Sequence, residues 1–569
     1  MRNFSVTNRP PMQSGPRRGK AKTEFTMQPG HHSGLHIIYG SRTGNSRAAA
    51  ELAFGYARYL GLECVLVDTS NMDLRDFEGF KNILLAVSTH GEGDPPAVAQ
   101  KFYEFIHSGE APSMKDVRFS ILALGDSSYR DFCKTGKDLR KRFLELGAKE
   151  LFPLAECDID YEEKAKGWVR SGVDAFRQVL PGKQTSQGKG FAFEINKREA
   201  DHENAWFARI IDKRFLTKPG YEKRTLHLSL STEGFPEKFE PGDSFGVYLN
   251  NSRLLVDSLL RELKYDGTMV VNSPKGRKLL KEALLSDYEI TMLTPLVVTR
   301  YAELSKNRRL AFLVKNKEFL DDYSKSNDLL DLVKDYPSAI SPDDLLSALR
   351  NLAPRLYSVA SSPLVYPDEL HFTAGLIEYN SNQRLHRGVC SVYFADRLEV
   401  GDSVPIFLEA NEKFRLPADD TRPLIMIGTG TGIAPYRAFL QQRDHTGAKG
   451  ENWLFFGDRH RDSDFLYGEE IGAWHKSGLL TRLDTSFSRD GAGKRYVQHS
   501  LMDHSSEIYD WIRHKNAVVY ICGNKRTMGQ DVKSCLEQII ASEGSLSAEE
   551  SAAYIQELKS ENRYQTDLY

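Results

Sequence analysis

The residues best suited to chemistry lie past the middle of the chain, in the stretch at 355–362. The guanidinium of Arg355 could bind a diphosphate through two parallel hydrogen bonds. The ring of Tyr357 could stack on a flat heterocycle, and the hydroxyl of Ser358 could point at a nitrogen of that ring. An ordinary β-strand with a polar face and a serine-rich end would contain the same residues. The flanking sequence must therefore decide between these two interpretations.

The first of three loops in the N-terminal third has the residues of a phosphate site. It lies at 41–46, after the apolar run 35–39 and before a predicted helix at 47–60. Backbone amides and hydroxyls that converge at a helix start favour a phosphate. The loop lacks the Lys-Ser/Thr pair of a Walker loop, and a simple capped turn between strand and helix is the alternative.

The other two loops follow apolar runs at 82–87 and 119–124. They are rich in glycine and hydroxyl side chains, and Tyr129 follows the second run. Uninterrupted apolar strands that alternate with amphipathic helices predict a parallel sheet covered on both faces. Ligands bind such sheets at the carboxyl ends of the strands. We therefore expect the three loops to form one site for a phosphate and a planar ring.

A further glycine-rich loop, at 428–435, follows the apolar run 424–427 and precedes a predicted helix at 436–443. It is similar to the dinucleotide-binding fingerprint, but no acidic residue follows at the spacing that reads a ribose 2′-hydroxyl. Hydroxyls and cations farther on, such as Ser488 and Arg489, suit a 2′-phosphate and favour NADPH over NADH. A solvated basic loop is the alternative for those residues.

The middle of the chain changes its pattern twice. Alternation typical of β-strands begins at 191–195 and predicts an antiparallel barrel. Between about 252 and 351 the pattern is helical, which predicts a helical insert in that barrel. The insert's helices are predicted at 254–263, 276–285, 297–303 and 343–349. A later helix, predicted at 392–398, could bind a diphosphate at its start, opposite Arg355.

Length and composition set the frame for these sites. A chain of 569 residues is long enough for three to five domains. A net charge of −2 argues against a general nucleic-acid binder, and no apolar run approaches the roughly 18 residues of a membrane span. The six cysteines are dispersed, so we expect no disulfide framework, no metal site and a reducing cytoplasm. Residues 1–33 are predicted to be a disordered tail, with a transit peptide as the alternative, and residues 181–190 a flexible linker.

Together these motifs resemble the diflavin reductases over residues 35–569. The loop at 41–46, the loop at 88–91 and LGDSSYRDFC at 124–133 match the family's FMN loops. RLYS at 355–358 and GVCS at 388–391 match the FAD signatures of the ferredoxin-reductase family. The resemblance implies three domains: a flavodoxin-like doubly wound sheet for FMN at 34–180, a ferredoxin-reductase-like FAD β-barrel with helical insert at 191–418, and an α/β NADP-binding domain at 419–569.

The resemblance also implies which residues bind each cofactor. For FMN they are Ser41, Arg42, Thr43, Gly44, Asn45, Ser46, Ser88, Thr89, His90, Gly91, Leu124, Gly125, Asp126, Ser127, Ser128, Tyr129, Phe132 and Cys133. For FAD they are Thr291, Arg355, Leu356, Tyr357, Ser358, Thr373, Ala374, Gly375, Tyr379, Gly388, Val389, Cys390, Ser391 and Tyr569. For NADP they are Gly430, Thr431, Ser488, Arg489, Lys494, Tyr496, Gln498 and Asp531. Ser358, Cys522 and Asp567 would surround the nicotinamide and the flavin as catalytic residues, and Tyr569 would cover the FAD ring until nicotinamide displaces it.

The end of the chain, RYQTDLY, implies a partner. With NEKFRLP at 411–417, NWLFFG at 452–457 and YVQ at 496–498, it resembles the flavoprotein (alpha) components of assimilatory NADPH-sulfite reductases. That resemblance implies electron flow from NADPH through FAD and FMN to a separate haemoprotein (beta) subunit that reduces sulfite to sulfide. A homo-oligomer is compatible with it. Two alternatives stay open: the same electron chain serving another acceptor, such as a cytochrome P450, and a non-catalytic flavin-binding interaction protein.

Overall fold

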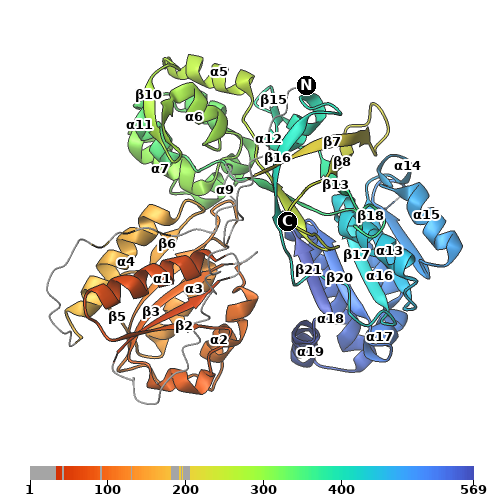
Figure 1. Ribbon diagram of the computed structural model, residues 1–569, viewed down its shortest axis with the longest axis horizontal. Helices are drawn as coiled ribbons and strands as arrows, with labels where there is room; N and C mark the ends of the chain where they lie inside the picture. Colours follow the sequence, from red (N-terminus) through yellow and green to blue (C-terminus); the bar gives the residue numbers. More distant parts are fainter. Residues whose placement is uncertain are drawn as a thin grey trace, which may run out of the picture.

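The computed structural model describes residues 34–41, 44–89, 93–129, 131–180, 191, 193, 195, 205–491 and 493–569. The predicted tail at 1–33 and linker at 181–190 lie outside these residues. Three large sheets follow one another along the chain, and the C-terminus lies near the centre where they meet (Figure 1). Every helix among the described residues is too short or too polar to cross a bilayer. The domain limits given above stay predictions.

The N-terminal unit is a parallel sheet with the order β2-β1-β3-β4-β5, and β6 pairs with β4. Its strands are β1 (Leu35–Gly40), β2 (Cys64–Asp68), β3 (Asn82–Ser88), β4 (Arg118–Leu124), β5 (Lys149–Glu150) and β6 (Ala155–Cys157). Its helices are α1 (Asn45–Tyr59), η1 (Leu74–Gly79), α2 (Ala97–His107), α3 (Lys134–Glu145) and α4 (Glu162–Arg177). Separate apolar cores lie under α1 and α4 and under α2 and α3, so the predicted sheet with two covered faces is confirmed.

The middle unit is an antiparallel sheet with the order β12-β9-β16-β7-β8-β13, and a bridge between Val359 and Phe372 joins its two outer strands into a barrel. The strands are β7 (Trp206–Phe215), β8 (Thr225–Ser231), β9 (Ser244–Val247), β12 (Arg355–Ser358), β13 (Glu369–Gly375) and β16 (Ser403–Glu409). The hairpin of β14 (Glu378–Ser381) and β15 (Arg384–Arg387) leads into α12 (Val389–Asp396). The predicted antiparallel barrel is confirmed.

The helical insert lies between β9 and β12 and has its own apolar core. It contains α5 (Arg253–Leu263), β10 (Val270–Ser273), β11 (Gly276–Leu279), α6 (Leu280–Ser286), α7 (Pro295–Ser305), α8 (Arg308–Leu313), α9 (Lys317–Ser326), α10 (Leu329–Asp335) and α11 (Pro342–Ala348). In Figure 1 the insert lies above the N-terminal unit, and α7 faces that unit.

The C-terminal unit is a parallel sheet with the order β19-β18-β17-β20-β21. Its strands are β17 (Leu424–Thr429), β18 (Asn452–Asp458), β19 (Arg482–Phe487), β20 (Val518–Gly523) and β21 (Tyr564–Leu568). The helices are η3 (Gly430–Ile433), α13 (Ala434–Thr446), α14 (Arg461–Asp464), α15 (Gly468–Ser477), α16 (Val497–Asp503), α17 (Ser505–Arg513), the π-helical η4 (Lys525–Gly529), α18 (Gln530–Gly544) and α19 (Ala548–Ser560). Apolar cores cover both faces of the sheet.

Three local predictions were wrong. The helix expected at 276–285 is the strand β11 followed by α6, because Gly276 adopts a left-handed φ of 101° and closes a hairpin with β10. The helix expected at 392–398 begins at Val389, so the GVCS residues form its first turn. At 191–195, the described residues form no barrel strand. Phe191 and Phe193 instead pack against Tyr56 of α1, at ring distances of 5.2 and 4.6 Å.

Candidate functional site

Ser358 and Asp567 meet where the barrel adjoins the C-terminal sheet. Ser358 is the last residue of β12, and its Oγ donates a hydrogen bond to Oδ2 of Asp567 at 2.7 Å. Asp567 lies on β21 in register with Cys522 on β20, and the Cys522 Sγ is 3.9 Å from the same carboxylate oxygen. Three of the four predicted catalytic residues are therefore in one place, although they come from three strands.

The thiol of Cys522 is suited to hydrogen bonding and not to nucleophilic attack. The residue is fully buried. Burial, and then the negative charge of Asp567, raise the pKa of the Cys522 thiol well above its usual value. A thiolate is the nucleophilic form of cysteine, so this protonated thiol can only donate or accept a weak hydrogen bond. The trio can orient a reactant and hold a proton near Asp567.

Tyr569, the last residue, lies beside this trio. Its backbone bonds to the backbone of Gly523 and Lys525 at 3.1 and 3.0 Å, and its hydroxyl is 2.5 Å from Oγ1 of Thr431. The side chain is 52% exposed. The main chain is therefore fixed while the ring lies at the surface, where it can move without opening a core. This suits an aromatic cover that gives way to a second ring.

Arg355 is held by an acidic residue that sequence analysis missed. Its Nη2 forms an ion pair with Oε2 of Glu289, and its Nη1 donates to the carbonyl of Ala353 at 2.9 Å. Glu289 also accepts from the backbone and the hydroxyl of Thr291 at 2.9 and 2.7 Å. Burial opposes the charge of Glu289, but Arg355 and Thr291 outweigh it and lower the pKa of Glu289. The predicted FAD residues Arg355 and Thr291 thus share one buried carboxylate.

Tyr357 and Leu356 place aromatic and apolar groups on opposite sides of β12. The ring of Tyr357 packs against Phe372 and Phe394, at 5.1 and 5.8 Å. Burial, and then Cys390, raise the pKa of the Tyr357 hydroxyl well above its usual value, so it stays neutral. Leu356 faces the other way and is 56% exposed. Leu356, a predicted FAD residue, therefore lies on the side of β12 that is open to a cofactor.

The start of α12 lies close to Arg355, and together they fit a diphosphate. Gly388 precedes the helix in an extended conformation, so the first-turn amides of Val389 and Cys390 have no partner within the helix. The guanidinium of Arg355 acts electrostatically on Cys390. Ser391 accepts a hydrogen bond from the amide of Ile377 at 3.0 Å, which leaves its own proton to donate. A cation opposite a helix start is a donor set that suits a diphosphate.

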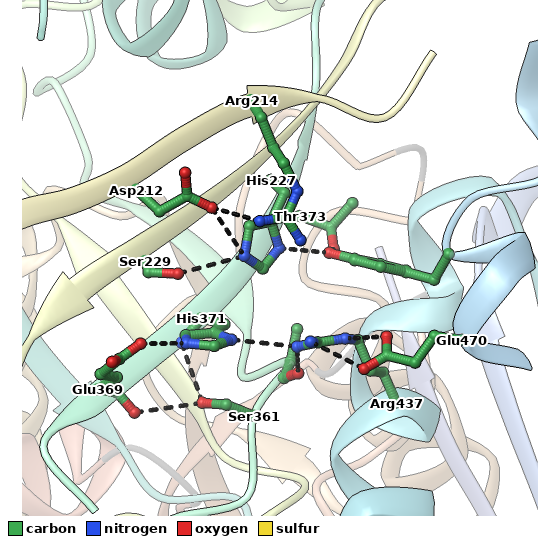
Figure 2. Close-up of polar contacts among 12 residues, drawn as sticks. Asp212, Arg214, His227, Ser229, Ser361, Glu369, His371, Thr373, Arg437 and Glu470 are labelled. Atoms are coloured by element: carbon green, nitrogen blue, oxygen red, sulfur yellow. Dashed lines mark hydrogen bonds and ion pairs between the residues drawn. The ribbon is translucent and has the colours of Figure 1, made fainter. Parts of the chain in front are cut away.

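Thr373 takes part in the contact between barrel and C-terminal unit (Figure 2). Its Oγ1 lies 2.7 Å from the hydroxyl of Tyr467 in the C-terminal unit. Arg437 of α13 crosses the same interface, donating to the carbonyl of Ala360 at 2.7 Å and pairing with Glu470 at 2.6 Å. This contact attaches the stretch at 355–362 to the C-terminal unit.

Gly375 and Ala374 follow Thr373 on β13. Ala374 is fully buried in the barrel core. A Cβ at Gly375 would lie 3.4 Å from Cγ2 of Thr431, so the end of β13 is close to the glycine-rich loop of the C-terminal unit. The structure therefore brings a predicted FAD strand and a predicted NADP loop together.

Tyr379 belongs to a hairpin that is fastened to the insert. Its ring stacks on His386 at 4.9 Å, and His386 lies 2.6 Å from Asp331 of α10. Asp328, Asp331 and His386 could be metal ligands by their spacing. However, the guanidinium of Arg384 pairs with both carboxylates, at 2.5 and 2.8 Å, and supplies the positive charge itself. The group is a structural clamp that orients Tyr379.

The first N-terminal loop keeps the features of a phosphate site. Gly44, with a left-handed φ of 91°, precedes α1, and its amide donates to Oγ of Ser41 at 3.0 Å. The hydroxyl of Ser46 is buried and has no hydrogen-bond partner among the described residues. A buried hydroxyl without a partner at a helix start fits a phosphate oxygen. Asn45 accepts from Tyr161 at 3.3 Å. Arg42, Thr43, His90 and Gly91 lie outside the described residues.

The other two loops meet at the carboxyl ends of β3 and β4. The amide of Thr89, just after Ser88, donates to the carbonyl of Leu124 at 2.8 Å. Gly125 allows close packing, because a Cβ there would lie 2.8 Å from the backbone nitrogen of Cys133. Asp126 accepts from the amide and hydroxyl of Ser128 at 2.9 and 2.6 Å, which shapes the turn before Tyr129.

A cavity of about 170 Å³ lies between these loops and the C-terminal unit. Its lining comes from Thr89, Asp126, Tyr129, Asp131, Phe132 and Cys133 on one side and from Lys525 and Leu568 on the other. Sequence analysis had no signal for Lys525 or Leu568, because they belong to another unit. Leu568 directly follows Asp567, so neighbouring residues of β21 contribute to both sites.

The predicted NADP residues line the carboxyl ends of the C-terminal strands. Gly430 has a left-handed φ of 55°, and a Cβ at Gly432 would lie 2.2 Å from the carbonyl oxygen of Cys522. Arg489, which follows Ser488, shares Glu222 with Arg459, each at 2.8 Å. Arg459 is a second cation that sequence analysis missed.

Of the remaining predicted NADP residues, Lys494, Tyr496 and Gln498 follow Arg489 in the chain, and Asp531 lies on α18. Gln498 donates to Asp531 at 3.1 Å. Lys494 is exposed and Tyr496 is 43% exposed. Two arginines with one carboxylate between them, followed in sequence by a lysine and an exposed ring, fit a phosphorylated nucleotide.

Comparison with known proteins assigns three families along the chain. A flavodoxin family model matches residues 37–168. A model described as FAD binding domain matches residues 198–393. A model described as oxidoreductase NAD-binding domain matches residues 426–534. These matches cover most of the three large sheets, but β16 lies beyond the second match and β21 beyond the third.

Full-length relatives carry one common description. The chain is 41% identical to the sulfite reductase (NADPH) flavoprotein alpha-component of Bacillus subtilis (strain 168), over 94% of this chain and 89% of that protein. It is 37% identical to the protein of the same description from Yersinia enterocolitica, over 94% and 90%. The corresponding protein of Vibrio parahaemolyticus is 35% identical, over 94% and 86%.

Proposed function

The chain belongs to the sulfite reductase (NADPH) flavoprotein alpha-component family, and we propose that it carries electrons from NADPH through FAD and FMN to a sulfite reductase haemoprotein. It is an NADPH-dependent flavoprotein reductase, and its cofactors are FAD and FMN. Flavins accept a hydride and release electrons singly, which is chemistry that side chains lack. The protein's own contribution is to bind, orient and shield these groups.

One observation carries the proposal: two successive residues of β21 contribute to the two sites. Asp567 bonds to Ser358 of the FAD barrel, and Leu568 lines the cavity at the FMN loops. The order of sites is therefore the glycine-rich NADP loop, then the Ser358 trio, then Tyr129. This order supports electron flow from the C-terminal unit to the N-terminal unit.

We assign the side chains as follows. Arg355, fixed by Glu289, binds the FAD diphosphate together with the start of α12. Ser358, Asp567 and the protonated Cys522 hold the nicotinamide against the flavin. Oδ2 of Asp567 accepts the Ser358 hydroxyl proton and thereby fixes its direction. Tyr569 excludes water from that face until nicotinamide displaces its ring. Positioning of this kind supplies most of the rate in hydride transfer.

The partner is proposed to be the haemoprotein subunit of sulfite reductase, in the cytoplasm. The descriptions of the relatives support this acceptor. A cytochrome P450 as acceptor has no observation in its favour. A non-catalytic flavin-binding role does not explain why the Ser358 trio is next to the NADP loop.

The test is anaerobic addition of NADPH to the FAD- and FMN-loaded protein, followed by flavin absorbance. We expect both flavins to bleach, and expect NADH to bleach them much more slowly. With the sulfite reductase haemoprotein and sulfite added, sulfide should form in proportion to NADPH consumed. Absence of bleaching would contradict the reductase function, and bleaching without sulfide would contradict only the acceptor.

A further inference from the structure

A buried ion pair joins the FMN loop of the N-terminal unit to the insert. Arg350 follows α11, and its Nη2 lies 2.6 Å from Oδ1 of Asp126. Its Nε lies 3.4 Å from Oδ2 of Asp158, which is just beyond β6. Only 3% of the Arg350 side chain and 1% of the Asp158 side chain are exposed. Arg350 and Asp158 are thus buried, whereas 34% of the Asp126 side chain, 224 positions away from Arg350, is exposed.

The acidic side of this contact shapes the FMN loop. Asp158 accepts from the amide of Ser127 at 2.9 Å and from its hydroxyl, while Asp126 accepts from Ser128. The Ser127 hydroxyl oxygen also lies 3.2 Å from Oγ1 of Thr294, the residue that caps α7 of the insert. The turn that leads to Tyr129 therefore touches the insert directly and also through Arg350.

The basic side of the contact leads to the proposed FAD site. The carbonyl of Arg350 accepts from the amide of Glu289 at 2.9 Å, and Glu289 is the residue that holds Arg355. The backbone of Arg350 thus holds Glu289 at the proposed FAD site, and its side chain reaches Asp126 in the FMN loop.

The energetics of such a pair favour a role in geometry over one in overall stability. Desolvation largely offsets the attraction of a buried ion pair, but removal of one partner leaves an uncompensated buried charge. Charged contacts across an interface also fix orientation and exclude other arrangements. The pair therefore gives little net binding and strongly selects one docked arrangement.

We propose that Arg350 is a positioning residue for electron transfer from FAD to FMN, because it fixes the FMN loop in the docked arrangement. The proposal rests on the proposed function. NADPH would transfer a hydride, which is two electrons and one proton, to bound FAD and would be oxidised to NADP⁺. Bound FAD would then pass these two electrons one at a time to FMN, and the proton that FAD releases would balance the proton that reduced FMN takes up. Arg350 affects only this second transfer.

The test is stopped-flow reduction by NADPH of the fully loaded protein, with FAD and FMN reduction followed separately. In Arg350→Gln we expect FAD reduction within about twofold of the wild type and FMN reduction slowed at least about tenfold, the usual effect of a small misplacement. Arg350→Lys should recover part of the rate. FMN reduction in Arg350→Gln combined with Asp126→Asn should be no slower than in Arg350→Gln alone, because both changes remove the same contact between Arg350 and Asp126.

Several controls separate positioning from damage. Arg308→Gln changes an exposed arginine of the same insert and should leave both rates unchanged. Flavin content and circular dichroism should match the wild type in every variant. FMN reduction within twofold of the wild type in Arg350→Gln, or equal slowing of both phases, would overturn the proposal. Failure of NADPH to reduce FAD in the wild type would instead contradict the proposed function.

Discussion

The hydroxyl of Ser358 donates a 2.7 Å hydrogen bond to the carboxylate of Asp567, across 209 residues of sequence. Ser358 ends a barrel strand, and Asp567 lies on the last strand of the C-terminal sheet. The bond exists only when barrel and C-terminal unit are correctly docked. Under the proposed function, hydride transfer therefore depends on the relative placement of the two units, and Arg437 of α13 supports that placement.

Replacement of Asp567 by asparagine should slow the first step and leave binding intact. The amide side chain would keep the size of the carboxylate but lose the charge that orients the Ser358 proton. We expect FAD reduction by NADPH to slow by about a hundredfold, which is typical when a reacting group is misplaced. Stopped-flow absorbance measures this rate. Glu557→Gln, an exposed acid of the same unit, should have the wild-type rate. An unchanged rate in Asp567→Asn would rule out the assigned role.

Glu289→Gln should weaken FAD binding and lower stability. The carboxylate compensates Arg355 within the barrel–insert boundary, and a broken buried pair costs about 3–5 kcal/mol. We expect a lower FAD-to-protein ratio after gel filtration and a lower melting temperature, while FMN content stays the same. Glu262→Gln, at an exposed position on α5, serves as the control. Equal loss of both flavins would indicate general unfolding and not a local effect at Arg355.

Arg489→Gln should reduce the preference for NADPH over NADH. Arg489 and Arg459 are partly exposed and share the single carboxylate of Glu222, so a phosphate dianion can compete for both. We expect the KM for NADPH to rise about tenfold and that for NADH to change less than about twofold. Steady-state kinetics with both nucleotides gives the ratio. Glu222→Gln should lower the KM for NADPH, and Arg513→Gln, on the exposed side of α17, should leave both values unchanged.

Local signals were sufficient for much of the fold and for part of the site. Apolar runs that end in glycine and hydroxyl residues predicted the parallel sheets, because strand, loop and helix are adjacent in sequence there. The resemblance of RLYS and of the chain end indicated Ser358 and Asp567 as partners in one site. The structure adds the hydrogen bond between them.

Contacts between distant elements had no comparable signal. Glu289 lies 66 residues before Arg355 in a helical insert, and Arg350 lies 224 residues after Asp126. Neither spacing follows from a helix or strand period. The alternating Phe191 and Phe193 illustrate a second limit. Periodicity indicates that alternate residues are apolar, but it does not say which core they join, and these two rings join that of the N-terminal unit.

His227 is a buried histidine in the contact between barrel and C-terminal unit (Figure 2). Its Nδ1 lies 2.9 Å from the hydroxyl of Tyr467 and its Nε2 lies 3.2 Å from Oγ of Ser229. Burial, and then the positive charges of Arg214 and Arg437, lower the pKa of His227 to about 2. Asp212, 3.8 Å away, does not offset these effects. The folded protein thus keeps this ring neutral.

The protein should therefore become less stable as the pH is lowered, and His227→Gln should weaken this pH dependence. Below a pH of about 6.5 the unfolded state binds a proton at His227, whereas the folded state does not. The free energy of unfolding therefore decreases as pH falls. The slope is about 1.4 kcal/mol per pH unit between roughly pH 6 and 3. Calorimetric melting temperatures from pH 7.5 to 5 should decline less steeply in His227→Gln than in the wild type. His445→Gln, at an exposed position, is the matched control. Parallel curves for His227→Gln and the wild type would show that this histidine is protonated in the fold.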